Sequence, residues 1–316
     1  MTTSALLRAA ARLDWEKRGI AIPGLIRNGN FFFTELKVFA NGLFDAWGGL
    51  DLDFLDRKFQ SGWISPRIPD GANFSAHSLI HGKVISGSWS HDSNSLHQRL
   101  RNDLQSLNPG QQELIDFEGE DVELKEGVRY AKYGWIRTTP QRKHHSEKSP
   151  LGETRYAFIR QQGQVYLVPL RIYADGLIDV HPKFGEEKLV DLHELQRMLE
   201  SNELCYAVDD HTSIEIDSLG RFEVSGVHPC VYSSEDFMSE IEDSILKLNG
   251  VPGSIHHCLL VHQEYQKNQT PENKERLKQA YEAIPEHKRM YAGDMDSKDG
   301  PIRRIIYVDQ DSDYDF

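Results

Sequence analysis

Residues 29–47 read GNFFFTELKVFANGLFDAW, and residues 163–181 read GQVYLVPLRIYADGLIDVH. The two stretches align without a gap at a constant offset of 134 (163 − 29). The identical pairs are Gly29/Gly163, Leu36/Leu170, Ala40/Ala174, Gly42/Gly176, Leu43/Leu177 and Asp45/Asp179. Because self-similarity at a fixed period is the signature of a repeated structural unit, we expect both stretches to fold in the same way.

The similarity continues downstream in further blocks, with small insertions between them. The matching blocks are Asp51-Leu52 with Asp191-Leu192, VISGSW around Gly87 with EVSGVH around Gly226, and Leu107-Asn108 with Leu248-Asn249. Chance is a poor explanation for several blocks that occur in the same order. The sequence therefore predicts two tandem copies of one unit, a first copy at residues 29–110 and a second copy at residues 156–250.

Each copy contains a strong hairpin signal, Asn41-Gly42 in the first and Asp175-Gly176 in the second. Such pairs favour a two-residue turn in which both residues take positive φ angles. The flanking runs, residues 31–39 and 165–173, are rich in the aromatic and β-branched residues that favour strands. We therefore expect a β-hairpin at the start of each copy.

The remainder of each copy shows a helix, three short strands and a closing helix. The first helix is expected at residues 51–60 and 188–200, and the strands near 63–68, 74–80 and 83–89, and near 204–208, 213–217 and 221–228. Ser95 is expected to cap the closing helix of the first copy, and Ser233 or Ser234 that of the second. Each unit is then ββαβββα, an antiparallel sheet covered by helices on one face, which is an α+β architecture.

The segments outside the copies have simpler patterns. Residues 1–28 predict a helix at 4–18 followed by a turn at Pro23, and residues 111–155 form a linker with a polar loop at 142–149. Residues 251–308 predict helices at 256–266 and at 271–284, the latter capped by Thr270, and a final strand at 302–308. The ending DQDSDYDF, residues 309–316, is an acidic tail.

The composition narrows the classes of function. The 316 residues carry a formal net charge of −13, which repels nucleic-acid backbones and suits a basic partner. The three cysteines, Cys205, Cys230 and Cys258, are widely spaced, which favours reduced thiols in a cytoplasmic protein. No cofactor-binding motif and no stretch of membrane-spanning length is found in the sequence, so we expect neither a cofactor nor a membrane span.

An acidic loop, GDMDSKDG, places Asp294, Asp296 and Asp299 close together in the chain. Carboxylates at such spacing can hold calcium or magnesium, and with His287 they predict a metal-assisted hydrolase or nuclease. The spacing departs from an EF-hand loop and the distal Glu is missing. A turn held by aspartate-to-backbone hydrogen bonds is the competing interpretation.

A second group joins Cys258 and His262, four residues apart on an expected helix, with the neighbouring His256 and His257. Zinc would need a further ligand and partners around it, so core or surface histidines are the competing interpretation. The basic loop at 142–148 together with Arg303 and Arg304 suggests a third possibility, a nucleotide or nucleic-acid sensor.

Two stretches resemble a group of uncharacterised bacterial domains. One runs from RNGNFFF through GWISPRIP to GSW, residues 27–89, and the other is AYEAIPEHKRMYAGDMDSKDGPIRRIIY, residues 280–307. Relatives of these domains resemble small α+β proteins found near bacterial toxin-immunity and phage-defence loci. The resemblance implies an association with such systems and assigns no chemistry.

The leading hypothesis is a non-enzymatic protein-binding protein of the immunity or phage-defence type. It would bind a basic toxin or effector through a sheet face or through the acidic loop, including Asp294, Asp296 and Asp299 and the neighbouring Arg303 and Arg304. The metal-assisted hydrolase and the nucleotide sensor are the alternatives. Residues matched between the copies are turn glycines and apolar residues, which serve folding rather than catalysis.

Overall fold

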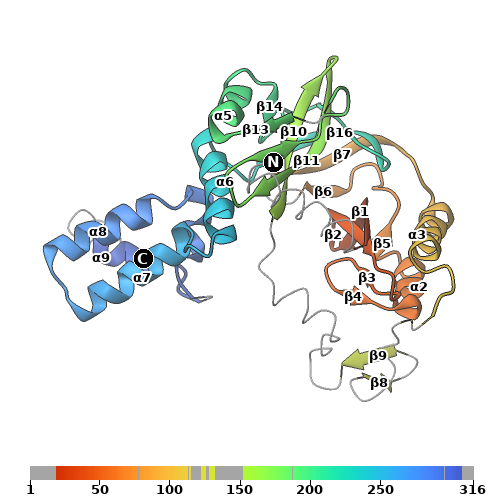
Figure 1. Cartoon of the computed structure of the whole chain (residues 1–316), viewed down its shortest axis with the longest axis horizontal. Helices are drawn as coiled ribbons and strands as arrows, with labels where there is room; N and C mark the ends of the chain where they lie inside the picture. The colour runs from red at the N-terminus through yellow and green to blue at the C-terminus, as the bar shows by residue number, and fades with distance from the viewer. Residues whose placement is uncertain are drawn as a thin grey trace, which may run out of the picture. The chain divides into compact units, whose positions relative to one another are not determined.

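A computed structural model describes residues 19–76, 79–112, 114, 122–125, 128–131, 152–186, 188–294 and 296–307. It consists of two compact units, which we describe separately (Figure 1). Unit 1 takes in Met1–Leu151, Ile159–Val168 and Val208–His228, and unit 2 takes in Gly152–Phe158, Pro169–Ala207 and Pro229–Phe316. The expected helix at 4–18, the loop at 142–149 and the tail at 309–316 lie outside the described residues.

The two copies have the same order of elements, which is the α+β arrangement that the sequence predicts. The first copy is β1 (Ile20–Asn28), β2 (Asn30–Val38), β3 (Phe44–Asp45), β4 (Gly49–Leu50), α2 (Leu52–Gln60), β5 (Ile64–Ser65), β6 (Asn73–Ala76), β7 (Ile80–Trp89) and α3 (Ser93–Leu107). The second is β10 (Gly152–Gln161), β11 (Gln164–Tyr173), β12 (Ile178–Val180), β13 (Lys188–Val190), α5 (Leu192–Glu200), β14 (Leu204–Cys205), β15 (Ser213–Ile216), β16 (Gly220–Pro229) and α6 (Ser234–Leu248). The linker contributes a separate hairpin of β8 (Val122–Lys125) and β9 (Val128–Ala131).

Some expected boundaries are corrected by these elements. The first copy begins one strand earlier than the sequence suggested, because β1 pairs with β2 along its whole length from Ile20↔Val38 to Asn28↔Asn30. The segment around Pro23 is therefore strand, not a turn. The first strand of the second copy, β10, begins at Gly152 rather than at residue 156. Residues 188–190, expected in a helix, form β13 against β12, and the helix starts at Leu192.

Hydrogen bonds repeat between the copies at offsets that grow with the insertions. Pairing of Asn73 with Lys83 in β6 and β7 is matched by Ser213 with Glu223 in β15 and β16, an offset of 140 (213 − 73). The backbone bond from Gly71 N to Val84 O is matched by His211 N to Val224 O. These shared contacts support a duplication at the level of backbone geometry, beyond sequence likeness.

The sheet pairing is mixed, which corrects the expectation of a purely antiparallel sheet. In unit 1, β2 pairs with β6 in parallel through Phe31↔Phe74. The equivalent pair, β11 with β15, is parallel through Val165↔Ile214. The parallel direction follows from the helix between these strands, because a crossover through a helix returns the chain in the same direction.

The expected two-residue turn is also corrected. Gly42 and Gly176 have φ angles of 78° and 83°, but Asn41 and Asp175 are not among the residues with positive φ. Gly42 N instead donates to Phe39 O, and Asn41 Oδ1 accepts from Leu43 N at 3.3 Å. Only the glycine needs the left-handed conformation, as in a three-residue hairpin loop.

The first copy buries a core between β1, β2 and the helices α2 and α3. Side chains two or four residues apart on the strands, such as Ile22, Ile26 and Leu36, meet Leu55 of α2 and Leu96 of α3. Alternate residues of the strands face the helices, and the apolar residues at helical spacing on α2 and α3 face the strands, so both sets are buried in one core. The strand order β15-β16-β7-β6-β2-β1-β5, which lies in unit 1, ends at β5.

In unit 2, residues 253–307 form a C-terminal module of α7 (Ser254–Lys267), α8 (Pro271–Glu282), the 3₁₀ helix η1 (Glu286–Tyr291) and α9 (Gly300–Tyr307), visible as the blue helices of Figure 1. The expected strand at 302–308 is wrong. Ile302 and Ile306 are buried four residues apart on α9 and share a core with Leu277 and Tyr281. The isoleucine-rich sequence suggested a strand, and tertiary packing at helical spacing overrides that preference.

Helix starts follow the cap rules with one change. Thr270 and Ser233 cap α8 and α6 as expected, each accepting a backbone N–H three residues on. Asp92, not Ser95, caps α3, and Ser95 sits three residues inside as the second half of a capping box. None of the helices that the structure describes is both long enough and apolar enough to cross a bilayer.

Candidate functional site

The acidic loop forms a hydrogen-bonded turn. Asp294 Oδ1 accepts from the backbone N of Asp296 at 3.0 Å, and from the N and Oγ of Ser297 at 2.6 and 2.7 Å. These hydrogen bonds, the backbone bond from Ser297 first, hold the pKa of Asp294 below its usual value. The aspartate thus serves its own turn, which is the competing interpretation from the sequence.

The other residues of the proposed metal site point to different partners. Asp299 accepts from the Tyr281 hydroxyl at 2.5 Å, and His287 Nε2 lies 2.5 Å from Glu240 Oε1. Among the described residues, no group of three or more His, Cys, Asp or Glu side chains is placed to hold a metal ion. Arg303 and Arg304 are exposed on α9. The structure therefore does not bring the three aspartates together around one point.

The histidine and cysteine group on α7 is divided between core and surface. Cys258 is fully buried, and burial raises the pKa of its thiol to about 11. His262 is partly buried, which lowers its pKa, while His256 and His257 are exposed. Cys258 therefore behaves as a small apolar core residue.

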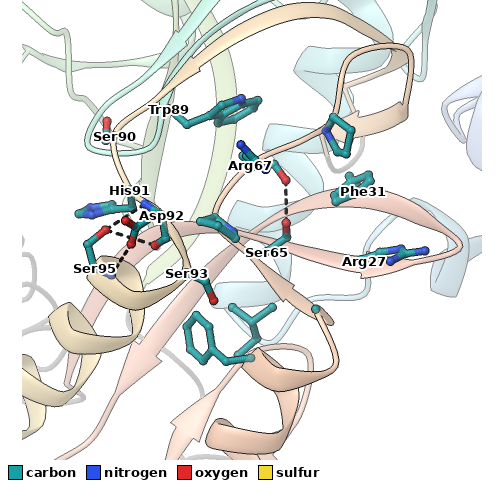
Figure 2. A pocket seen from close by; sticks show the side chains of 15 residues that line it. Arg27, Phe31, Ser65, Arg67, Trp89, Ser90, His91, Asp92, Ser93 and Ser95 are labelled. Carbon is teal, nitrogen blue, oxygen red and sulfur yellow. Dashed lines mark hydrogen bonds between the residues drawn. The ribbon is translucent and has the colours of Figure 1, made fainter.

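A cleft in the first copy was not foreseen from the sequence (Figure 2). Its volume is about 750 Å³, within the range of small-ligand pockets. Its walls come from the end of β1, the start of β2, the α2–β5 connection, the segment after β5 and the β7–α3 connection. The lining residues that bear on the argument are Arg27, Phe31, Phe59, Arg67, Trp89 and Asp92.

The two arginines come from neighbouring segments of the cleft wall. Leu25 of β1 is opposite Ser65 of β5; Arg27 follows Leu25 by two residues on β1, and Arg67 lies two residues beyond the end of β5. In Figure 2 Ser65 lies beside Arg67, to whose carbonyl it donates, and Phe31 lies beside Arg27, its partner in the strand pairing.

Neither arginine is neutralised by a carboxylate. In the part of the chain that the structure describes, Arg27 and Arg67 form no ion pair, and both are exposed. Arg27 contributes its backbone N–H to Trp63 O at 2.7 Å, and Arg67 offers its carbonyl to Ser65 Oγ at 2.6 Å. The backbones are thus fixed in position while the guanidinium groups remain available to a ligand.

The opposite rim carries Asp92, whose side chain is committed to α3. Its Oδ1 accepts from Ser95 N at 2.7 Å, while Ser95 Oγ accepts from Asp92 N at 2.9 Å. The bonds from Ser95 lower the pKa of Asp92, so the group stays ionised. Asp92 therefore places one fixed negative charge across from the two cations.

Trp89 forms a rigid aromatic wall. Its ring stacks on Phe222 with centroids 5.4 Å apart and an angle of 14° between the planes. Glycines leave room for this ring: a Cβ at Gly87 would lie 2.8 Å from Trp89 Nε1, and a Cβ at Gly220 would lie 3.2 Å from Trp89 Cε3. A pre-positioned indole costs a ligand little ordering entropy.

The second copy provides an internal comparison for these residues. With offsets of 134 before the first helix and 140 after it, Arg27 corresponds to Gln161, Arg67 to Ala207 and Trp89 to Pro229. The second copy forms the same elements without these side chains. The matched positions of the two copies do not include these cleft residues. The signal that could have found them is the difference itself: Arg27, Arg67 and Trp89 have no like residue at the corresponding positions of the second copy.

The arrangement can bind an anion next to an apolar surface. The arginines supply forked donors that suit carboxylate or phosphate oxygens, and Phe31, Phe59 and Trp89 supply apolar walls. Among the described lining residues, Ser65 Oγ donates to Arg67 O, and Ser95 Oγ accepts from Asp92 N.

Two family models match the chain. The family model described as "Domain of unknown function (DUF7638)" matches residues 15–111 and 140–252, which together contain both copies.

The chain belongs to the DUF7638 family.

A second model, "Domain of unknown function (DUF7639)", matches residues 253–314, the region of the C-terminal module. Both DUF7638 segments extend upstream of β1 and β10, in agreement with copies that begin at those strands. No curated protein and no solved structure matches the chain.

Proposed function

We propose that this DUF7638 protein is a binding protein rather than a catalyst, and that the first-copy cleft recognises an anionic group. One observation carries the proposal: Arg27 and Arg67 form no ion pair with any residue that the structure describes, and both line one cavity in a chain with a net charge of −13. A strongly acidic chain has carboxylates in excess with which to pair its arginines. Two arginines left unpaired at one cleft therefore favour a ligand as their partner.

The duplication supports a binding role for these arginines. The second copy forms the equivalent strands and helices with Gln161 and Ala207, so neither guanidinium is required by the fold. Residues that the fold does not need, and that gather at one cavity, are candidates for recognition.

A metal-assisted hydrolase has less support. The carboxylate oxygens of Asp294 and Asp299 accept hydrogen bonds from Ser297 and Tyr281, and a metal would have to displace those donors. Asp294, moreover, is bonded to neighbours only two and three residues along the chain.

The expected basic partner also has less support at the C-terminal module. Acidic and basic residues are nearly equal in number between residues 253 and 307, so this segment does not create the negative field that would attract a basic toxin. An association with toxin immunity or phage defence stays a prediction. A reducing, cytoplasmic setting is part of the proposal, because Cys205, Cys230 and Cys258 are free thiols.

Thermal shift and isothermal titration with inorganic phosphate and glutarate at millimolar concentration test anion binding. We expect stabilisation of the wild-type chain and its loss in the double variant Arg27→Gln/Arg67→Ala, which installs the second-copy residues. Lys83→Gln, which removes an exposed charge outside the cleft, should retain the shift. Equal shifts in the wild type and the double variant, or no shift with either anion, would overturn the proposal.

A further inference from the structure

Building on the proposed anion site, we infer that its ligand is a small molecule that joins a planar aromatic ring to an anionic group. The ring would stack on Trp89, and the anionic group would pair with the arginines that line the cleft. Nucleoside monophosphates and aromatic carboxylates share this chemistry. The inference rests on the open face of Trp89, on differences between the two copies and on the volume of the cleft.

Trp89 has one covered face but is not buried as a whole. Its indole stacks on Phe222, with ring centroids 5.4 Å apart and an angle of 14° between the planes. Phe222 is 1% exposed and lies in the core, whereas Trp89 is half-buried and lines the cleft. Because Phe222 occupies one face of the indole, a second planar ring can stack on the opposite face. Figure 2 shows Trp89 along the upper wall of the cleft, above Arg67.

The other aromatic rings of the cleft are less accessible. Among the lining residues that the structure describes, Phe31 and Phe59 are each 8% exposed. Phe59 also makes a T-shaped contact with His97, with ring centroids 4.9 Å apart. A planar ligand stacks on the face of a ring, so Trp89 is the aromatic residue of this lining that offers enough surface.

Two residues that place the indole differ between the copies. With the offset of 140, Trp89 corresponds to Pro229, and Gly220 corresponds to Ile80. Gly220 and Ile80 occupy the same place in the matched pairs of β15 with β16 and of β6 with β7. A Cβ at Gly220 would lie 3.2 Å from Trp89 Cε3, so the glycine of the second copy makes room for the tryptophan of the first. The repeated backbone forms with a proline in place of Trp89, which favours recognition as the role of the indole.

The volume of the cleft limits the ligand to a small molecule. It is about 750 Å³, and pockets of roughly 300–1,000 Å³ enclose most of a drug-sized ligand. A nucleic-acid strand would continue beyond the cleft, where a chain with a net charge of −13 repels its phosphates. A nucleoside monophosphate or an aromatic carboxylate keeps its charge within the cleft.

A ligand with both groups should bind more tightly than a ligand with either group alone. A ring stacked on Trp89 removes apolar surface from water, and a phosphate or carboxylate forms charge-assisted hydrogen bonds with a guanidinium group. When the two groups are joined, the second contact forms at high effective concentration, so both contribute to the affinity of one ligand.

Isothermal titration calorimetry on the full chain tests the inference. Adenosine monophosphate and naphthoate are the complete probes, because each has a ring and an anion. Ribose phosphate and acetate are their counterparts without the ring, and adenosine is the counterpart without the anion. We expect at least one complete probe to bind at least tenfold more tightly than its counterparts, and the tighter of the two identifies the kind of anion.

Variants at tryptophan separate stacking from other contacts. Trp89→Leu keeps an apolar side chain but removes the ring, so it should weaken binding of the tighter complete probe at least tenfold and leave binding of its counterpart without the ring within twofold. Trp89→Phe keeps a ring and should stay within fivefold of the wild type. Trp47→Leu is the matched control, since Trp47 is 45% exposed and lies outside the cleft lining, and it should stay within twofold.

The outcomes separate this inference from the proposed function. If phosphate or glutarate binds through the arginines but neither complete probe gains tenfold over its counterparts, the ligand class is wrong and the anion site stands. A gain that persists in Trp89→Leu overturns stacking on the indole. If neither the small anions nor the complete probes depend on Arg27 and Arg67, both proposals fail. Circular dichroism and the unfolding midpoint of each variant confirm that any loss is not caused by misfolding.

Discussion

Asn108 and Asn249 occupy the same place in the two copies and form the same bond. Each lies at the end of the closing helix of its copy and donates Nδ2 to a carbonyl of the hairpin loop, Asn108 to Ala40 at 2.8 Å and Asn249 to Ala174 at 2.7 Å. Each side chain thus ties the last helix of a copy back to its first hairpin, which are far apart in sequence. The matched asparagines are folding residues, as the duplication argument requires.

Substitution of either asparagine should destabilise the chain to a similar extent. Asn108→Ala and Asn249→Ala each remove hydrogen bonds to two carbonyls, so each should lower the free energy of unfolding by about 1–2 kcal/mol. Urea denaturation followed by circular dichroism measures this. Asn102→Ala, a substitution at an exposed position on α3, is the control and should cost less than either. A loss in only one copy would contradict their equivalence.

The helix caps offer a second matched pair. Asp51 and Asp191 each accept from the backbone N–H three residues on, at 2.8 Å, but Asp51 is 2% exposed whereas Asp191 is exposed. Asp191→Ala should cost about 1 kcal/mol, and Asp51→Ala about 2 kcal/mol because the burial adds to the loss of the cap. Chemical denaturation compares the two. A larger loss at Asp191 would show that burial does not set the difference.

Gly220 is expected to be intolerant of any side chain. Its φ angle is 150°, and an added Cβ would lie 2.5 Å from Ser88 O, a backbone atom that cannot move alone. Gly220→Ala should lower the free energy of unfolding by roughly 2–4 kcal/mol. The control is Gly71→Ala, where φ is 81° but space is open, with an expected cost of about 1 kcal/mol. Equal costs at the two sites would contradict the close approach at Gly220.

Most elements of the fold could be predicted from the sequence because the same element is indicated independently in each of the two copies. The helices at 52–60 and 271–282 follow from amphipathic spacing and cap residues, which are local signals. The helix at 300–307 could not, because Ile302, Ile305 and Ile306 also suit a strand and only packing against α8 decides. Parallel pairing of β2 with β6 likewise depends on the path of the chain through space.

The cleft was beyond prediction for a different reason. Arg27, Arg67 and Trp89 come from three separate stretches of the sequence, and no spacing rule joins them.

The ionic cluster of unit 2 could not be foreseen either, since it joins Arg155, Glu240 and His287 across long sequence separations. With an offset of 141 (249 − 108), the residue that corresponds to Glu240 in the first copy is Arg99. This one position of the closing helix therefore has opposite charges in the two copies.

Glu240 is the centre of a buried ionic cluster that joins α6 to the C-terminal module. It is 3% exposed, and its carboxylate lies 2.7 Å from Arg155 Nη1, 2.5 Å from His287 Nε2 and 2.8 Å from Lys288 Nζ. Burial alone would raise the pKa of Glu240, but Lys288, Arg155 and His287 outweigh burial and lower it below the ordinary 4.5. The ionised carboxylate is therefore stabilised by folding.

The lowered pKa fixes the direction of the pH dependence. Stability from this group is complete above the unfolded-state pKa of 4.5 and is lost as the pH falls through the folded-state value. Glu240→Gln should lower the free energy of unfolding by about 3 kcal/mol at neutral pH, because Arg155 and Lys288 lose their buried partner. The variant should also lose less stability than the wild type between neutral pH and pH values below 4.5.

Urea denaturation across pH, with hydrogen exchange over residues 253–307, measures both effects. Glu242→Gln is the matched control, since Glu242 is an exposed carboxylate on the same helix and should change stability little. Exchange should accelerate first in the C-terminal module of Glu240→Gln, because η1 contributes His287 and Lys288 to the cluster. If Glu240→Gln keeps the wild-type pH dependence, the carboxylate is not the group whose protonation loosens the module.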